Sequence, residues 1–200
     1  MSGSSGYWEN RYRHGGNSGA GSYNRLAEFK ANVINDFIEK NDILSVIEWG
    51  CGDGNQLALL KCPEYTGIDI SKTAIQNCTE IFQNDPRKMF YEKSDYHPTK
   101  KFDLSLSLDV IYHLVEDDVF SEYIYSLFQS SRKFVCIYAS NTEDQISNAA
   151  THVKHRKFTD HIQQYYPNWK LYEYIPNAYP YDPEDQDNTS FADFYIFQKE

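Results

Sequence analysis

The feature that most constrains this 200-residue chain is a glycine-rich turn, Gly-Cys-Gly-Asp-Gly at residues 50–54, directly after an apolar run at residues 43–49. Glycine adopts backbone conformations that other residues avoid, and it lets a ligand approach the main chain closely. We expect residues 54–61 to form a helix, whose amino end favours an anionic group. A strand, a glycine turn and a helix in this order predict an α/β sheet with a ligand at the turn. A tight turn without a ligand would show the same glycines.

An acidic residue stands where the second strand of such a unit should end. Residues 65–70 form another apolar run, and Asp69 lies near its end. A carboxylate about 20 residues beyond the turn is placed to accept hydrogen bonds from ribose hydroxyls. Asp69 could instead cap the next helix, but Ser71 is better placed for that role.

The periodicity of apolar residues predicts an alternation of strands and helices. Ser22 is the expected cap of the first helix. We expect helices at 22–41, 54–61, 71–83, 117–130 and 159–166, and strands at 43–49, 65–70, 89–92, 102–108, 134–139, 169–175 and 191–198. This alternation implies crossover connections and therefore a mostly parallel sheet. The many glycines in residues 7–21 predict no regular structure there.

Composition excludes several classes of protein. The net charge of −10 disfavours a nucleic-acid partner, which would require a basic surface. The four cysteines are scattered without Cys-x-x-Cys spacing, so we expect no metal site and no disulfide scaffold. The sequence contains no run of 18 apolar residues that would indicate a membrane span, and residues 1–6 lack the features of a signal peptide. We therefore expect a cytoplasmic protein.

Four motifs together resemble the class I S-adenosylmethionine-dependent methyltransferases: Glu48-x-Gly50-x-Gly52-x-Gly54, Gly67-Ile-Asp69-Ile-Ser71, Ser94-Asp95 and Leu108-Asp109-Val-Ile-Tyr-His113. The resemblance covers about residues 7–139. It implies a Rossmann-like α/β fold with a mostly parallel seven-stranded sheet, an antiparallel last strand and helices on both faces. It also implies S-adenosylmethionine as the cofactor and S-adenosylhomocysteine as the product.

The resemblance assigns a part of the cofactor to each motif. The glycine turn would hold the methionine carboxylate, Asp69 the ribose, Asp95 the adenine amino group with Tyr96 beside the ring, and Asp109 the methionine end. The residues that it implies contact the cofactor are Tyr7, Trp8, Arg11, Glu48, Gly50, Cys51, Gly52, Gly54, Gln56, Asp69, Ile70, Ser94, Asp95, Tyr96, Leu108 and Asp109.

The amino-terminal stretch resembles family members that begin with Tyr-Trp-x-x-Arg-Tyr. In those proteins such a segment folds over the cofactor, so we expect residues 1–21 to be a flexible leader and lid, and residues 22–200 to be a single methyltransferase domain. Arg11 would reach the cofactor carboxylate. The alternative is a partly ordered tail.

Two features bear on the methyl acceptor. His113, four residues beyond Asp109, is the candidate general base, although it could instead bond the backbone at a helix start. The basic cluster at residues 151–158 is a candidate anion site, although it could instead be a solvated loop. The residues expected to contact the acceptor are Tyr12, Tyr23, His152, His155 and Arg156.

A narrower resemblance concerns the acceptor itself. The tip of the fourth strand lacks the Asn/Asp-Pro-Pro-Tyr motif of enzymes that methylate nucleic-acid bases. The amino-terminal element and His-x-x-His-Arg-x-Phe resemble small bacterial methyltransferases of capsule and surface-polysaccharide biosynthesis. This implies O-methylation of a small anionic or sugar acceptor, such as a glycan precursor or a phosphoramidate.

Two rival interpretations stay open at this point. An NAD-dependent oxidoreductase shares the glycine turn and the acidic residue, but its fingerprint places the third glycine one residue later than Gly54. A non-catalytic subunit that binds adenosyl nucleotides would need no acceptor pocket. The sequence leaves the oligomeric state open.

Overall fold

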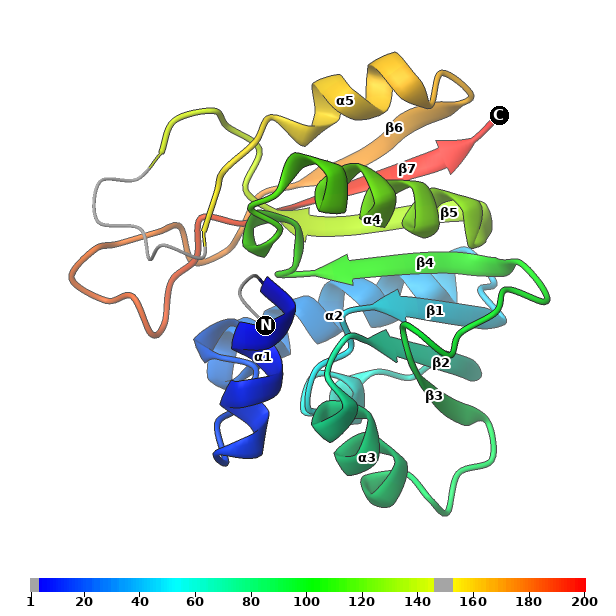
Figure 1. The fold of residues 1–200 in the computed structure, drawn as a ribbon. Helices are drawn as coiled ribbons and strands as arrows, with labels where there is room; N and C mark the ends of the chain where they lie inside the picture. The colour runs from blue at the N-terminus through cyan, green and yellow to red at the C-terminus, as the bar shows by residue number, and fades with distance from the viewer. Residues whose placement is uncertain (1–3, 146–152) are drawn as a thin grey trace.

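The protein is built on a seven-stranded sheet with the strand order β3-β2-β1-β4-β5-β7-β6 (Figure 1). The computed structural model describes the backbone of residues 4–145 and 153–200. Strands β1 to β5 are parallel to their neighbours, and β7 runs antiparallel to both β5 and β6. The predicted mostly parallel sheet with an antiparallel last strand is therefore confirmed.

All seven predicted strands form, and the long helices lie where the periodicity predicted them. The strands are β1 (Ser45–Trp49), β2 (Glu64–Asp69), β3 (Lys88–Glu92), β4 (Phe102–Leu108), β5 (Ser131–Ala139), β6 (Trp169–Ile175) and β7 (Asp193–Lys199). The α-helices are α1 (Ser4–Arg13), α2 (Asn24–Lys40), α3 (Lys72–Ile81), α4 (Asp117–Gln129) and α5 (Phe158–Tyr165). Short 3₁₀ turns are η1 (Ala20–Ser22), η2 (Leu57–Leu59) and η3 (Ile111–His113).

Strand β5 sends alternate side chains to two separate cores, as the two-residue period of a strand requires. In β5, Phe134, Cys136 and Tyr138 join the core beneath α2, while Val135 and Ile137 join the core beneath α4 and α5. Helices therefore cover both faces of the sheet, as predicted.

Three local predictions were wrong. Residues 7–21 are not irregular throughout, because the glycines begin only at Gly15 and α1 forms before them. Ser22 does not cap α2; it lies in η1, and Tyr23 precedes the helix without a side-chain cap. Residues 54–61 form only η2, because Gly54 still has a left-handed φ of 81° and the chain continues to turn there.

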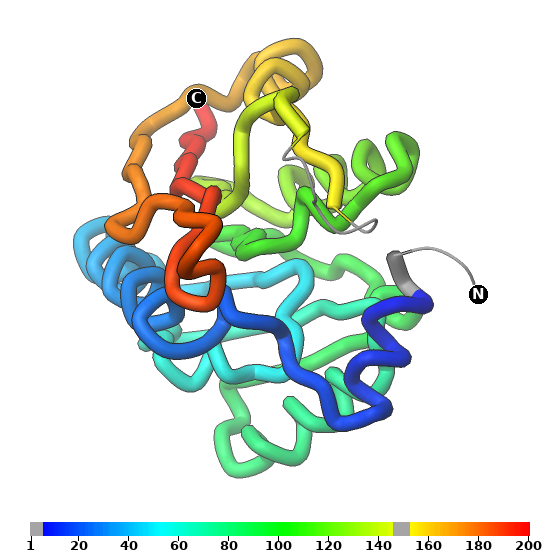
Figure 2. The backbone as a smooth tube through the Cα atoms, turned by 90° about the vertical axis from the view of Figure 1, so that its left-hand side faces the viewer, coloured from blue at the N-terminus to red at the C-terminus, as the bar shows by residue number. Residues whose placement is uncertain are grey.

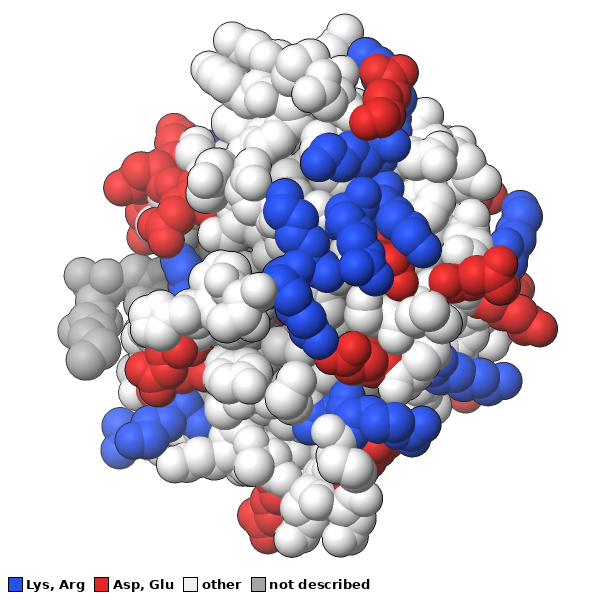
Figure 3. Space-filling model, turned by 90° about the vertical axis from the view of Figure 1, so that its right-hand side faces the viewer, with Lys and Arg blue, Asp and Glu red and all other residues white. Residues whose placement is uncertain are grey.

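The order of the strands reverses between β1 and β4, and their carboxyl ends open a crevice there. Figure 2 faces this edge, where α1 lies beside the sheet and the loop before β7 folds near α2. Lys and Arg side chains gather on the opposite face, at the amino ends of the strands (Figure 3). No helix within the described residues is long and apolar enough to cross a membrane.

Candidate functional site

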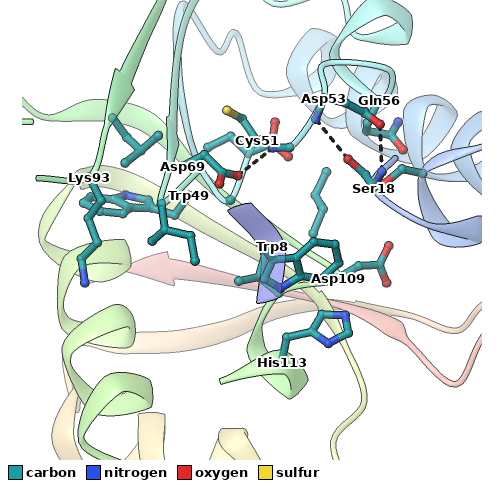
Figure 4. A pocket seen from close by; sticks show the side chains of 18 of the residues that line it. Trp8, Ser18, Trp49, Cys51, Asp53, Gln56, Asp69, Lys93, Asp109 and His113 are labelled. Carbon is teal, nitrogen blue, oxygen red and sulfur yellow. Dashed lines mark hydrogen bonds between the residues drawn. The ribbon is translucent and has the colours of Figure 1, made fainter. Parts of the chain in front are cut away.

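A pocket lies at this reversal point, between the glycine turn, the ends of β2 and β4, and the amino-terminal segment (Figure 4). The residues lining it that the sequence predicted are Trp8, Tyr12, Glu48, Gly50, Cys51, Gly52, Gln56, Asp69, Ile70, Leu108, Asp109 and His113. The fold thus brings these predicted residues together from four separate segments of the chain.

The glycine turn presents bare backbone to the pocket. Gly50 and Gly52 have φ values of 84° and 59°, which side chains disfavour. A Cβ atom at Gly50 would lie 2.5 Å from Val110 Cγ2, and one at Gly52 would collide with the Ser18 hydroxyl. Both glycines are therefore required by the turn and by its close packing.

Asp69 joins the end of β2 to the glycine turn. Its carboxylate accepts hydrogen bonds from the backbone amides of Gly52 and Ser71, each at 2.9 Å. Burial raises the pKa of Asp69, against these amide bonds, which lower it. The carboxylate is fixed at the pocket wall before any ligand reaches it.

Glu48 lies beneath the turn at the end of β1. The Tyr65 hydroxyl donates to it at 2.5 Å, and the side chain is buried. Burial raises the pKa of Glu48 to about 7, although the Tyr65 hydrogen bond and the charge of Lys30 both lower it. This carboxyl group therefore titrates near neutral pH.

Gln56 lines the pocket and keeps one buried acceptor unused. It is 5% exposed, and its Nε2 donates to the Ala27 carbonyl at 3.1 Å. Its Oε1 has no hydrogen-bond partner among the described residues. A buried acceptor without a partner costs free energy, so a ligand that donates to it gains affinity.

Lys30 lines the pocket and was not predicted. Its Nζ donates to Asp109 Oδ2 at 2.6 Å, and none of its side chain is exposed. Asp109 has a left-handed φ of 59°, and its Oδ1 accepts from the Tyr112 hydroxyl at 2.8 Å. The sequence did carry a signal, because Lys30 falls on the apolar face of α2, four residues after Leu26.

The amino-terminal segment closes one side of the pocket. The Trp8 indole meets the His113 ring edge to face at 5.0 Å between centroids. Asp53 accepts from the Ser18 amide and the Tyr23 hydroxyl, both at 2.8 Å. Ser18 also lies 2.9 Å from the Tyr12 hydroxyl. These contacts fix residues 8–23 against the glycine turn.

Several residues predicted to bind the cofactor do not line the pocket. The Arg11 guanidinium donates to the carbonyl and side chain of Asn17 and lies near the Tyr7 hydroxyl. Gly54 packs against α3, where a Cβ atom would lie 2.9 Å from Phe82.

The segment after β3 also lies outside the pocket lining. Ser94 and Asp95 are exposed, and Ser94 donates to Asp95. Tyr96 does not line the pocket; its ring packs against that of Trp49, which does, with 5.8 Å between the ring centroids. Lys93, which was not predicted, lines the pocket in this region and pairs with Glu122 at 2.9 Å.

The predicted basic cluster does not form an open anion site in its described part. Arg156 donates to the Leu114 and Val115 carbonyls and pairs with Asp117 at 2.7 Å. His155 is buried, with its Nδ1 2.6 Å from the Ser140 hydroxyl. Arg156 therefore holds the loop after β4, and His155 packs against the residue that follows β5. His152 lies outside the described residues. The described residues contain no group of three side chains able to hold a metal ion.

The residues of the pocket fit the adenosyl cofactor implied by the sequence motifs. Bare backbone at Gly50 and Gly52, a fixed carboxylate at Asp69 and the unused acceptor of Gln56 are suited to a ribose and an amino-acid end. Residues 47–136, which carry most of this site, match the family described as a methyltransferase domain. Over these residues the chain matches a methyltransferase domain, and the fold around them is the Rossmann-like methyltransferase fold. The cofactor of such a domain is S-adenosylmethionine, which leaves as S-adenosylhomocysteine.

Solved structures share this fold at low sequence identity. N-methyltransferase NodS from Bradyrhizobium japonicum WM9, in complex with S-adenosylhomocysteine, is 14% identical with a TM-score of 0.73, over 99% of each chain. Magnesium protoporphyrin IX methyltransferase from Synechocystis PCC 6803 is 12% identical with a TM-score of 0.70, over 98% of this chain and 97% of that one. The methyltransferase domain of bacterial CtHen1-C is 16% identical with a TM-score of 0.66, over 88% and 99%. No curated protein matches the sequence.

Proposed function

We propose that this methyltransferase transfers a methyl group to a hydroxyl of a small sugar-like acceptor that binds beside His113. The observation that carries the proposal is the position of His113, which lines the pocket after β4 next to Trp8 and close to Asp109. The first turn after β4 borders the crevice where ligands of open α/β sheets bind. An imidazole there can take the hydroxyl proton.

The proposed reaction needs little from the protein beyond positioning and one proton transfer. When bound, the cofactor supplies a methyl group on a positively charged sulfur. The acceptor oxygen attacks this methyl group, and the carbon–sulfur bond breaks. A nitrogen of His113 accepts the proton that the hydroxyl loses. The products are the methyl ether, S-adenosylhomocysteine and a protonated His113.

Aromatic side chains favour a sugar-like acceptor over a highly charged one. Trp8 and Tyr12 line the pocket, and a sugar packs its C–H face on aromatic rings. The expected anion site does not support an anionic acceptor, because Lys154 and Arg156 already pair with Asp117. The proposal therefore keeps a glycan precursor of surface-polysaccharide modification as the acceptor and does not rely on a charged group.

A methyl-transfer assay with labelled cofactor tests the acceptor class. The panel contains free sugars, nucleotide sugars, primary amines and short RNA. We expect label in the sugar or nucleotide-sugar arms. Label only in the amine or RNA arms would overturn the proposal.

His113→Gln tests the proposed base. The variant should lower kcat about 10²- to 10⁴-fold, the usual contribution of general-base catalysis, while the affinity for S-adenosylhomocysteine stays unchanged. His97→Gln, an exposed histidine in the loop after β3, serves as the matched control. Full activity of His113→Gln would remove this residue from the mechanism.

A further inference from the structure

A buried ion pair stands at the pocket wall. The Lys30 ammonium lies 2.6 Å from Asp109 Oδ2 and 5.3 Å from the centre of the Tyr138 ring, with no exposed side-chain surface. A buried ammonium is costly unless an anion is paired with it. Lys30 therefore requires an anionic partner in every state of the pocket, although that partner can change.

Asp109 does not depend on Lys30 alone. Its other oxygen accepts the Tyr112 hydroxyl at 2.8 Å, and its backbone amide donates to the Tyr138 carbonyl at 3.0 Å. Its side chain is 12% exposed. Asp109 can therefore stay hydrogen-bonded if Lys30 turns to another anion.

Two groups of the pocket are suited to a zwitterion. Lys30 on α2 is a cation, and Gln56 Oε1 is a buried acceptor without a partner among the described residues. Gln56 is tied to the same helix, because its Nε2 donates to the Ala27 carbonyl, three residues before Lys30. An amino-acid group offers a carboxylate for the cation and an ammonium for the acceptor.

Arg11 is less suited to this carboxylate. Its guanidinium donates to Asn17 at 2.5 Å and 3.3 Å, and it does not line the pocket. Of these two cations, Lys30 is therefore the one that lines the pocket.

We propose that Lys30 binds the carboxylate at the amino-acid end of the cofactor, and that Asp109 occupies this position before the cofactor binds. Binding then exchanges one carboxylate for another at the same buried ammonium, while Asp109 keeps its hydrogen bond from Tyr112. Gln56 Oε1 accepts from the cofactor's ammonium group. The inference rests on the cofactor of the domain and not on the proposed acceptor.

Calorimetric titration with two ligands tests the exchange. S-adenosylhomocysteine carries the amino-acid end, whereas 5′-methylthioadenosine lacks it. Lys30→Met should weaken binding of S-adenosylhomocysteine by about 10- to 100-fold, as expected for loss of a charge-assisted hydrogen bond. It should leave the affinity for 5′-methylthioadenosine nearly unchanged. That second titration also shows that the variant is folded.

The Asp109→Asn variant gives the sharper result, because the exchange predicts a gain. Without the competing carboxylate, S-adenosylhomocysteine should bind more tightly than it does to the original protein. Weaker binding would show that Asp109 contacts the ligand directly, and it would overturn the exchange.

Controls separate the remaining outcomes. Lys40→Met, an exposed lysine on the same helix, should change neither affinity. The double variant Lys30→Met with Asp109→Asn keeps the pair neutral and should show the same loss for S-adenosylhomocysteine. If Arg11→Met rather than Lys30→Met removed the preference for S-adenosylhomocysteine, the inference would be wrong. If neither ligand bound the unchanged protein, the cofactor assignment itself would fail.

Discussion

At the scale of single residues, the site combines groups that a sequence reveals with groups that only the fold reveals. Glycine and acidic residues can be recognised by their spacing in the sequence. Gly52 and Asp69 were identified in this way, and both line the pocket. Lys30 was missed because a lysine on a helix is ordinarily solvated. Its place on the apolar face of α2 indicated burial, and only the fold shows its ion pair with Asp109. Arg156 was predicted to contact the acceptor, but its guanidinium donates to backbone carbonyls of the loop after β4. The sequence alone does not show that this loop lies beside Arg156.

The buried Glu48 gives a prediction about stability and pH. Its pKa is raised to about 7 in the folded protein, from an ordinary value of 4.5. Between these values the folded state holds a proton that the unfolded state has lost, so stability falls as the pH rises through this window. Across this pH window, the free energy of unfolding of the unchanged protein should fall by on the order of 3 kcal/mol more than that of Glu48→Gln.

Urea unfolding of both proteins at a series of pH values measures this difference. Glu39→Gln, an exposed glutamate at the end of α2, should give a flat difference curve. A curve that is equally flat for Glu48→Gln would mean that Glu48 is ionised throughout the range.

At the scale of elements, apolar patterning predicted the strands and long helices well because their faces are buried. The patterning failed for segments whose conformation is set by turn geometry or by contacts with distant residues. The helix expected at 54–61 shrinks to η2 because the turn persists through Gly54. The helix α1 has little apolar periodicity of its own, and it docks through Glu9, which accepts from Ser71 and Thr73 at the start of α3. Such a long-range contact leaves no mark in the local sequence.

The Glu9 contact can be removed without touching the pocket. Glu9→Ala should free α1, since three hydrogen bonds to the first turn of α3 are lost. Amide hydrogen exchange in α1 should accelerate, and the affinity for S-adenosylhomocysteine should fall by about 1–2 kcal/mol. Glu28→Ala, an exposed residue of α2, is the control. Unchanged exchange in α1 would show that other contacts hold the helix.

At the scale of the whole molecule, the resemblance of a few motifs and the alternation of strands and helices were enough to predict a mostly parallel seven-stranded sheet with an antiparallel last strand. The distribution of charge was not predictable. Lys and Arg gather at the amino ends of the strands, away from the pocket (Figure 3). Arg132 and Lys133, at the start of β5, there pair with the buried Asp103. These two pairs compensate the buried charge of Asp103.

From the residues that form the two cores, we predict that the sheet folds without α1. Neither core includes a residue of α1. A protein that lacks residues 1–13 should still melt cooperatively, within about 8 °C of the full chain. Its affinity for S-adenosylhomocysteine should fall more than tenfold, or about 1.4 kcal/mol, because Trp8 and Tyr12 leave the pocket. Calorimetry measures both quantities, and a truncated chain that does not fold would contradict the prediction.

Ser71 ties the wall of the pocket to its contents. Its amide donates to Asp69, its hydroxyl donates to Glu9, and the same oxygen accepts from the Ala74 amide. One small residue thus connects a carboxylate of the pocket wall, through its amide, with helix α1, through its hydroxyl. On that side of the pocket, we expect the rates of ligand entry and release to depend on how long α1 stays attached.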